Sequence, residues 1–430
     1  MNYAGPEEGT PAGSGLELTP FRGLRYDPDR VGSLAAVTSP PYDVIVRPDG
    51  LLELESADPY NIVRLILPQD GTPAARNRQA ADTLNRWLAE GVLAADPEPG
   101  LYVYEQRDGD LLQRGVIGNL RLSDPADGVV LPHEDVMPHV IADRAALMRA
   151  TSANLEPLLL TYRGNGSAYG AAAVIERTAA LPPLLATTTE DGISHRLWAV
   201  TDPAEVTEIR TDLGRHQALI ADGHHRWATY LRLRAEHPSP SPWDYGLVLL
   251  VDTARYPLRV RAIHRLLHRL PVADALAALG DSFRVRRLDV SLAEALEALA
   301  AAAAEGNAFV LAGDGSFHLV DRPSPDLLAR TIPAGHPEAW RALDATVLHA
   351  TLLDHVWGIP EDSPAHIAYI HDTTATVEKA ERDGGTAVLM HPVHEEVVRE
   401  LARQGVTMPR KSTSFGPKPA SGLVLRALTP

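Results

Sequence analysis

The residues that decide the fold are ALIADGHHRWATY, at positions 218–230. The run opens as an apolar strand, breaks at an Asp-Gly pair and continues from two histidines as an amphipathic helix. Glycine permits the tight turn, and the start of a helix presents backbone N–H groups and a positive dipole end to an anion. Imidazole and guanidinium side chains would converge on the same point, as a phosphate oxygen requires. The predicted phosphate ligands are Gly223, His224, His225 and Arg226.

The same residues also fit an ordinary helix start, in which Asp222 caps the helix and a histidine is buried. The spacing alone does not separate the two interpretations, but two adjacent histidines before an arginine favour the functional one. Adjacent residues on a helix point about 100° apart. His224 and His225 therefore cannot both face one ligand, and at least one of them is expected to pack or to orient a neighbour.

Length, charge and cysteine content limit the number of domains and the kinds of partner and chemistry that we expect. A chain of 430 residues exceeds one ordinary core, which stops growing near ~250–300 residues, so we expect two domains or one enlarged domain. Its 40 basic and 56 acidic residues give a net charge of −16, which argues against nucleic acid as a partner. Cysteine is absent, which excludes disulfides, thiolate nucleophiles and Cys-based zinc sites.

Targeting signals are the next feature. The first 20 residues lack the basic and apolar regions of a leader, and no later segment approaches ~18 uninterrupted apolar residues. We therefore expect a cytoplasmic protein with no membrane partner.

Short apolar runs alternate with helical patterns along the chain, which predicts an α+β fold with a mixed sheet. A helix is expected at 74–90 and hairpins at 101–122 and 308–320. Further strands are expected at 155–162, 195–200, 216–221 and 245–251. We expect a disordered tail at 1–17, an N-terminal mixed α/β domain at 18–270 and a C-terminal α/β subdomain at 271–430 whose last segment, 405–428, returns to the core.

The segment LPHEDVMPHVIADR, at 131–144, gathers acidic, basic and histidine side chains between two prolines and predicts a functional loop. Its histidines lack the i, i+4 spacing of a zinc protease, so that interpretation is rejected. Glu134 or Asp135 would serve as a general base toward a hydroxyl, or as a ligand of Mg²⁺ on nucleotide phosphates. The alternative is a solvated acidic loop in which Asp143 caps the next helix.

The segment MPRKSTSFGPK, at 408–418, concentrates cations and hydroxyls in an otherwise acidic chain. It is not a Walker A loop, because Arg410 precedes the lysine and Pro409 lacks an N–H. Its side chains would neutralise phosphate oxygens during transfer, and the alternative is a solvated basic loop. The predicted nucleotide-binding residues here are Lys411, Ser412, Thr413 and Lys418.

Several other polar residues are expected to line a substrate cleft. Rigid turns near the N-terminus carry aromatic and charged side chains, and one arginine is expected on a strand in NIVRLIL, at 61–67. The predicted substrate-binding residues are Arg22, Tyr42, Asp43, Arg64, His133 and Arg144.

Four separated motifs together resemble a prokaryotic family, domain of unknown function 1015. They are PFRGLRYDPDRVGSLAAVTSPPYDVI (20–45), LPHEDVMPHVIADRAALMRATSANLEPLLL (131–160), IADGHHRWAT (220–229) and MPRKSTSFGPKPASGLV (408–424). The strand–DGHHR–helix unit is similar to the phosphate-binding turn of the ParB/sulfiredoxin superfamily, which includes free-serine kinases with a comparable DG-x-HR element. The chain departs from the family at Trp227, where tyrosine is frequent, and at 133–136, which reads His-Glu-Asp-Val where His-Glu-x-Thr is common.

The resemblance implies a ParB/sulfiredoxin-like nucleotide-binding core that uses ATP or ADP with Mg²⁺. The function expected first is a nucleotide-dependent phosphotransferase acting on a small hydroxylated metabolite such as serine or another amino-acid-like acceptor. A non-catalytic regulatory protein of ParB type is the second alternative, and a metal-dependent hydrolase is the third. In the first, Glu134 activates the hydroxyl, Asp222 orients a histidine or metal-bound water, and Lys411 counters developing charge. The predicted catalytic residues are Glu134, Asp222, His225 and Lys411, and the predicted metal ligands are Glu134 and Asp135.

Overall fold

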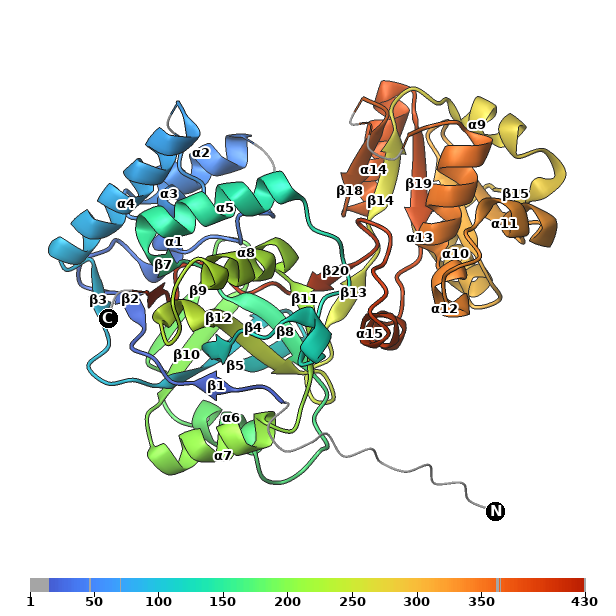
Figure 1. The fold of residues 1–430 in the computed structure, drawn as a ribbon. Helices are drawn as coiled ribbons and strands as arrows, with labels where there is room; N and C mark the ends of the chain where they lie inside the picture. Colours follow the sequence, from blue (N-terminus) through green and yellow to red (C-terminus); the bar gives the residue numbers. More distant parts are fainter. Residues whose placement is uncertain (1–14, 46–47, 70, 361–362, 364, 429–430) are drawn as a thin grey trace, which may run out of the picture. The chain divides into compact units, whose positions relative to one another are not determined.

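The computed structural model describes residues 15–45, 48–69, 71–360, 363 and 365–428 (Figure 1). The chain divides into two compact units. The first unit comprises the described residues of Met1–Pro132, Val136–Leu258 and Pro417–Pro430, and the second comprises those of His133–Asp135 and Arg259–Gly416. Most of the predicted tail, up to residue 14, lies outside the described residues. Leu16 is fully buried, and its N–H donates to the carbonyl oxygen of Leu213 at 3.2 Å, so ordered chain begins before the first strand.

Across its described residues, the first unit is built on a nine-stranded mixed sheet with the order β6-β11-β8-β12-β5-β4-β10-β9, and β1 pairs with β5. β11 runs parallel to β6 and antiparallel to β8, while β12 runs parallel to β8 and antiparallel to β5. The strands are β1 Leu18–Thr19, β4 Leu101–Asp108, β5 Leu111–Arg121, β6 Val130–Leu131, β8 Leu158–Tyr162, β9 Leu185–Thr188, β10 Ser194–Val200, β11 Ala218–Asp222 and β12 Tyr245–Asp252.

Helices cover both faces of this sheet. Figure 1 shows α5 and α8 on one side and α6 and α7 on the other. Two short ribbons, β2 with β3 and β7 with β21, complete the unit. The helices are α1 Leu34–Val37, α2 Pro48–Ala57, α3 Val63–Ile66, α4 Pro73–Ala89, α5 Pro138–Thr151, α6 Ala171–Ala179, α7 Pro203–Leu213 and α8 His224–Ala235, with short 3₁₀ turns at Pro125–Asp127 and Pro242–Asp244. The remaining strands are β2 Leu24–Tyr26, β3 Leu93–Ala95, β7 Ala153–Asn154 and β21 Arg426–Ala427.

The core of the first unit explains why its central strands are almost wholly apolar. Every residue of β8 and of β11 is buried, because helices pack on both faces of the sheet. Their side chains join apolar residues of the covering helices, such as Trp227 and Tyr230 of α8. The strand–turn–helix unit predicted from the quoted stretch is therefore confirmed, with the turn at one edge of the core.

The second unit has its own sheet, with the order β15-β17-β16-β19-β14-β18 and all pairings antiparallel. The predicted hairpin at 308–320 is confirmed as β16 and β17. The strands are β13 Arg259–Arg261, β14 His264–Leu267, β15 Arg284–Leu288, β16 Ala308–Ala312, β17 Phe317–Asp321, β18 Ile367–Ile370, β19 Thr386–Met390 and β20 Ser414–Gly416. The helices are α9 Val272–Leu279, α10 Leu292–Ala303, α11 Pro325–Thr331, α12 Glu338–Arg341, α13 Asp344–Thr346, α14 Thr373–Asp383 and α15 Glu395–Arg403, with a 3₁₀ turn at Gly280–Ser282 and a π-helix at Val347–Val356.

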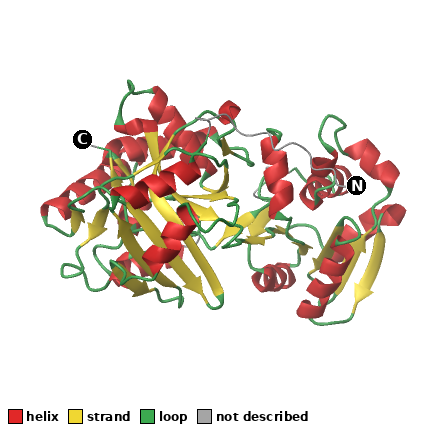
Figure 2. Cartoon of the chain, turned by 90° about the horizontal axis from the view of Figure 1, so that it is seen from below, coloured by secondary structure: helices red, strands yellow, loops and turns green. Residues whose placement is uncertain are grey.

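Both units combine helices with sheets, as Figure 2 shows, which confirms the predicted α+β class. Two local predictions are wrong. Arg64 lies on the short helix α3 instead of a strand. The segment after Pro138 is the regular helix α5, because proline is well suited to the first helical position, where its missing N–H has no intrahelical partner to lose. Asp143 is therefore inside that helix and does not cap it.

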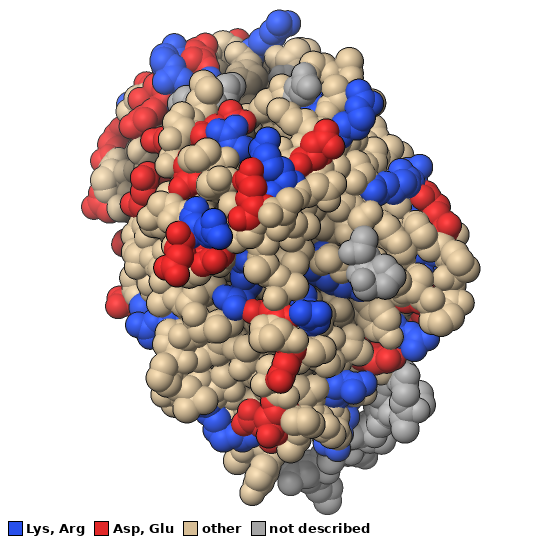
Figure 3. Space-filling model, turned by 90° about the vertical axis from the view of Figure 1, so that its left-hand side faces the viewer, with Lys and Arg blue, Asp and Glu red and all other residues tan. Residues whose placement is uncertain are grey.

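The surface drawn in Figure 3 intersperses basic and acidic side chains. Exposed ion pairs such as Arg149 with Glu236, at 2.7 Å, contribute about 0–1 kcal/mol each. Within the described part of the chain, the helices are too short or too polar to span a bilayer.

Candidate functional site

The predicted turn is built from the end of β11 and the start of α8. Gly223 adopts a left-handed conformation, with φ of 99° and ψ of 29°. A Cβ at this position would lie 2.9 Å from Cγ of Leu158 and 3.3 Å from Nε of Arg226. The backbone conformation and the crowding both require glycine here. Helix α8 begins at His224, directly after this turn.

A chain of alternating charges lies at the turn. Arg226 donates from Nη2 to Oδ2 of Asp222 at 2.7 Å, and Nζ of Lys418 donates to Oδ1 of the same carboxylate at 2.6 Å. Lys418 also forms a short ion pair with Asp43. Burial lowers the pKa of Lys418, but the charges of Asp222 and Asp43 outweigh it and hold this pKa above its ordinary value. The four groups carry no net charge together, which makes the burial of Asp222 and Arg226 tolerable.

The buried end of this chain is Arg226. Its guanidinium donates from Nη1 to the carbonyl oxygen of Pro157 at 3.0 Å, while its Nε has no hydrogen-bond partner among the described residues. Burial lowers the pKa of Arg226, but Glu156 and Asp222 more than compensate and raise it. Glu156 is itself buried and accepts hydrogen bonds from the Tyr42 N–H and the Ser421 hydroxyl, both at 3.0 Å. Burial raises the pKa of Glu156.

The two histidines have different surroundings, as adjacent helix positions require. His224 is buried, and burial, followed by the charges of His225 and Lys418, lowers its pKa to about 3. It is therefore neutral at pH 7. His225 is half-buried, and its Nε2 accepts the N–H of Met137 at 3.1 Å, at the start of α5. His224 therefore adds no second cation beside Lys418 at neutral pH.

Tyr42 and Arg144, two predicted substrate contacts, lie beside this cluster. The Tyr42 ring centroid is 4.5 Å from the guanidinium carbon of Arg144 and 5.8 Å from that of Arg226. Burial raises the pKa of Tyr42 to about 12, so the phenol is neutral. Arg144 donates to the carbonyl oxygen of Ile66 at 3.0 Å and to Asp143 at 2.7 Å. Arg144 is thus held in a defined position on α5.

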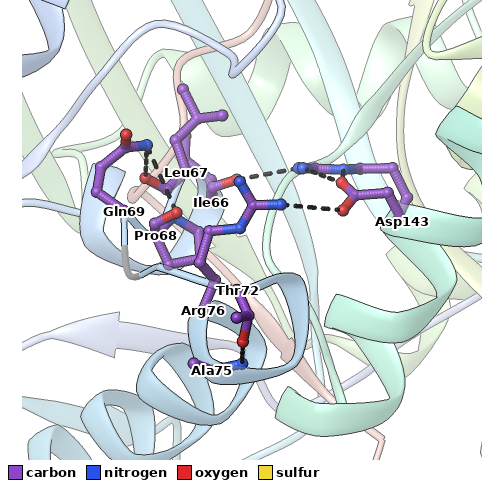
Figure 4. A network of polar contacts seen from close by, with 9 residues as sticks. Ile66, Leu67, Pro68, Gln69, Thr72, Ala75, Arg76 and Asp143 are labelled. Carbon is purple, nitrogen blue, oxygen red and sulfur yellow. Dashed lines mark hydrogen bonds and ion pairs between the residues drawn. The ribbon is translucent and has the colours of Figure 1, made fainter.

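Figure 4 shows the network that anchors this part of α5 to α3 and α4. Arg76 of α4 reaches Asp143 of α5 at 3.9 Å, and Gln69 folds its amide back onto the carbonyl oxygen of Leu67 at 2.8 Å. A small cavity of about 30 Å³, close to the volume of one water molecule, lies nearby in the first unit. Its lining combines apolar side chains with Arg144 and Arg226, and comprises Ile66, Arg144, Leu147, Met148, Ala153, Leu155, Glu156, Arg226 and Tyr230.

Several predicted residues lie close together within the second unit. The N–H of Met408 donates to the carbonyl oxygen of His133 at 2.8 Å, so the 133–135 and 408–413 segments run side by side. The ring of His133 contacts the hydroxyl of Thr413 at 3.0 Å, and the N–H of Lys411 reaches Oε1 of Glu134 at 3.4 Å. The structure thus brings Glu134 close to the backbone of Lys411 within the second unit.

Other predicted residues make local contacts. The side chain of Ser412 bonds the carbonyl oxygen of Pro409. Arg22 donates to the carbonyl oxygen of Asp96 at 2.7 Å, and Arg64 donates to that of Glu55 at 2.6 Å. Asp135 is exposed. Over the described ranges there is no group of three or more His, Cys, Asp or Glu side chains arranged to hold a metal ion.

Sequence reasoning missed Glu156 and Ser421. Glu156 had a signal, because it is a single charged residue directly before Pro157 and an apolar strand, where a carboxylate is costly unless it is paired. Ser421 had none, since nothing in its neighbouring residues identifies Ser39 as the residue that it pairs with.

Comparisons with known proteins place this chain in a family. Free serine kinase in complex with AMP is 15% identical, with a TM-score of 0.36, over 70% of this chain and 87% of that one. A conserved hypothetical protein from Pyrococcus furiosus is 15% identical, with a TM-score of 0.34, over 70% and 90%. SbnI with a C-terminal truncation, from Staphylococcus aureus, is 10% identical, with a TM-score of 0.36, over 72% and 86%. No curated protein matches. The family model described as protein of unknown function (DUF1015) matches residues 18–346, and the chain belongs to that family.

Proposed function

We propose that the Gly223 turn and Lys418 bind the phosphates of a nucleotide, ATP or ADP, and that the protein is a phosphotransferase acting on a small hydroxylated metabolite. The observation that carries the proposal is the half-buried Lys418, held by two carboxylates beside the start of α8. A positioned cation and the N-terminus of a helix are two independent attractors of a phosphate group.

The charge chain indicates how such a ligand would enter. Asp222 and Arg226 are its buried end, with 10% and 6% of their side chains exposed, whereas 35% of the Asp43 side chain is exposed. A phosphate would therefore compete with Asp43 for Lys418, and Asp222 would keep the lysine in place. Arg226 is fixed by Asp222 and Pro157, so its contribution is long-range charge and positioning of that carboxylate.

The nucleotide is suggested by the motif resemblance of DGHHR to the turn of the free-serine kinases. In the transfer step, the oxygen of the acceptor hydroxyl forms a bond to the terminal phosphorus of the nucleotide. The bond between that phosphorus and the bridging oxygen of the leaving nucleotide breaks. The hydroxyl proton passes to a general base, and Lys418 with the N–H groups of α8 would stabilise the negative charge on the leaving phosphate.

Magnesium is the metal that this chemistry implies, since it neutralises nucleotide phosphates when bound. Glu134 and Asp135 supply hard carboxylate oxygens, which are the ligands that this ion prefers. The two residues fit such an ion in ligand type.

Titration calorimetry of the full chain with ADP and ATP tests the proposal. Lys418→Met should weaken binding about 10- to 100-fold, because it removes a charge-assisted contact. Lys379→Met is the matched control, since Lys379 is a half-buried lysine paired with Asp383 on α14, and it should bind as the wild type does. Equal affinities for the two variants would contradict the proposal.

A transfer assay separates the enzyme from a non-catalytic nucleotide sensor. Wild-type protein is incubated with ATP or ADP, Mg²⁺ and a panel of amino acids and polyols, and phosphorylated products are detected by mass spectrometry. Nucleotide binding without a phosphorylated product over the whole panel would favour the regulatory alternative and end the phosphotransferase proposal.

A further inference from the structure

Lys418 lies on a segment that cannot hold itself in place through regular secondary structure. Residues 417–420 belong to neither a helix nor a strand. Lys418 is flanked by Pro417 and Pro419, which have no N–H, so the lysine carries the single backbone donor of the tripeptide. The sheet can therefore hold the backbone of this segment only through its carbonyl oxygens, the N–H of Lys418 and the next residue, Ala420.

Two buried glutamines fix the residue before the lysine. Gln106 on β4 and Gln113 on β5 are cross-strand neighbours with 1% and 2% of their surface exposed. Both donate from Nε2 to the carbonyl oxygen of Pro417, at 3.1 Å and 3.0 Å. Gln106 also donates to Oε1 of Gln113 at 2.5 Å, which ties the pair together.

A buried tyrosine fixes the second residue after the lysine. The hydroxyl of Tyr104, on β4, accepts the N–H of Ala420 at 3.2 Å. The same hydroxyl lies 2.9 Å from Nδ1 of His195, on β10. Burial lowers the pKa of His195 to about 4, so the ring is neutral and adds no competing charge.

Burying the polar side chains of Gln106, Gln113 and Tyr104 in the sheet costs free energy. Burying an amide or a hydroxyl inside a sheet is unfavourable unless each one is hydrogen-bonded, and valine or leucine would satisfy the strands at lower cost. Here three neighbouring polar side chains converge on the two residues that bracket Lys418. Together they fix the backbone position of Lys418, from which its side chain extends.

We propose that Gln106, Gln113 and Tyr104 are positioning residues that hold Lys418 between Asp222 and Asp43. This inference rests on the proposed function for the role of the lysine, but the positioning itself can be measured without any nucleotide. The three residues do not touch the ligand in this proposal and act only through residues 417–420.

The chain offers a direct readout, because it has only three lysines, Lys379, Lys411 and Lys418. The full-length protein is labelled with an amine-reactive reagent, and the rate at each lysine is measured by mass spectrometry. Loss of the two carboxylate contacts would lower the pKa of Lys418, and each unit by which it falls raises the neutral, reactive fraction about tenfold. We expect Tyr104→Phe to speed labelling of Lys418 severalfold, with the rates at the other two lysines unchanged.

Tyr102→Phe is the matched control. Tyr102 lies two positions away on the same strand, is equally buried and also uses its hydroxyl, which accepts the N–H of Gly23 at 2.8 Å and donates to Asp96 at 2.6 Å. It should leave the labelling of Lys418 at the wild-type rate. The double variant Gln106→Leu/Gln113→Leu removes both amides that bond Pro417 and replaces them with apolar side chains suited to buried strands. It should also accelerate labelling at Lys418.

The outcomes separate this inference from the function on which it rests. Unchanged labelling of Lys418 in both sets of variants would overturn the positioning role, and so would faster labelling at all three lysines, which indicates general loosening. In either case the calorimetric result for Lys418→Met would still stand. Conversely, a Lys418→Met variant that binds nucleotide normally would end the proposed function and leave the labelling result intact.

Discussion

Lys418 and Lys411 belong to the same basic stretch of the chain, yet Lys418 is half-buried in the first unit and Lys411 is exposed in the second. Lys418 bonds two carboxylates through its side chain, while Lys411 reaches Glu134 through its backbone N–H. A buried cation needs partners at fixed positions, and an exposed one exchanges freely with water. A positive charge alone does not therefore define a phosphate site. The partners that hold the charged group in one position also define it.

The largest expected change in stability comes from removing a buried charge, and it tests the difference between buried and exposed cations. Arg226→Ala leaves Asp222 and Glu156 without their arginine, and breaking such a buried pair costs about 3–5 kcal/mol. We expect the unfolding free energy of the first unit, measured with urea by tryptophan fluorescence, to fall by this amount. Arg410→Ala is the counterpart in the exposed stretch and should change stability by less than about 1 kcal/mol. Similar losses for both variants would remove the contrast between the two stretches.

The second test concerns the backbone. Gly223→Ala must adopt a positive φ and also meets the Leu158 side chain at 2.9 Å. The conformation costs about 1–2 kcal/mol and the overpacking about 1–3 kcal/mol, so the total is about 2–5 kcal/mol.

Gly405 supplies the control for this substitution. It has φ of 68° after α15 in the second unit, and a Cβ there would meet nothing within 4 Å. Gly405→Ala therefore carries the conformational cost alone, about 1–2 kcal/mol. Equal losses at the two glycines in urea unfolding would show that the turn at 223 is not crowded.

Much of the fold could be predicted from periodicity. The apolar runs that became β8, β11 and β12, and the helix beginning at His224, are confirmed, because burial on both faces leaves few alternatives for such runs. Prediction was weaker where short segments are set by tertiary contacts. NIVRLIL reads as a strand, but α3 turns within it, since the side-chain oxygen of Asn61 accepts the N–H of Val63 at 2.9 Å.

The site could be predicted only in part. The residues of the Gly223 turn are contiguous, so their proximity follows from the sequence. The pairing of Asp222 with Lys418 joins positions far apart in the chain, and no local pattern encodes it. Glu156 and the two glutamines under Pro417 were missed because a single polar residue in an apolar run indicates a buried partner without identifying it.

The smallest effect is a pH dependence that distinguishes the two units through one buried histidine in each. Burial lowers the pKa of His224 to about 3 and that of His264, on β14 of the second unit, to about 4. Unfolded histidine titrates near 6.5, so below that pH the unfolded state binds a proton that the folded state excludes. Stability is then lost as the pH falls, at about 1.4 kcal/mol per pH unit for each histidine.

Substitution by glutamine removes the contribution of one histidine at a time. His224→Gln should flatten the loss of unfolding free energy below pH 6.5 in the first unit, and His264→Gln should do the same in the second. The window for His224 extends to about pH 3 and that for His264 to about pH 4, because the folded-state pKa sets the lower limit. Urea unfolding at pH 7, 6 and 5 measures the slopes. An unchanged slope in His224→Gln would mean that this histidine is protonated in the folded protein, and the Gly223 turn would then hold a second cation beside Lys418.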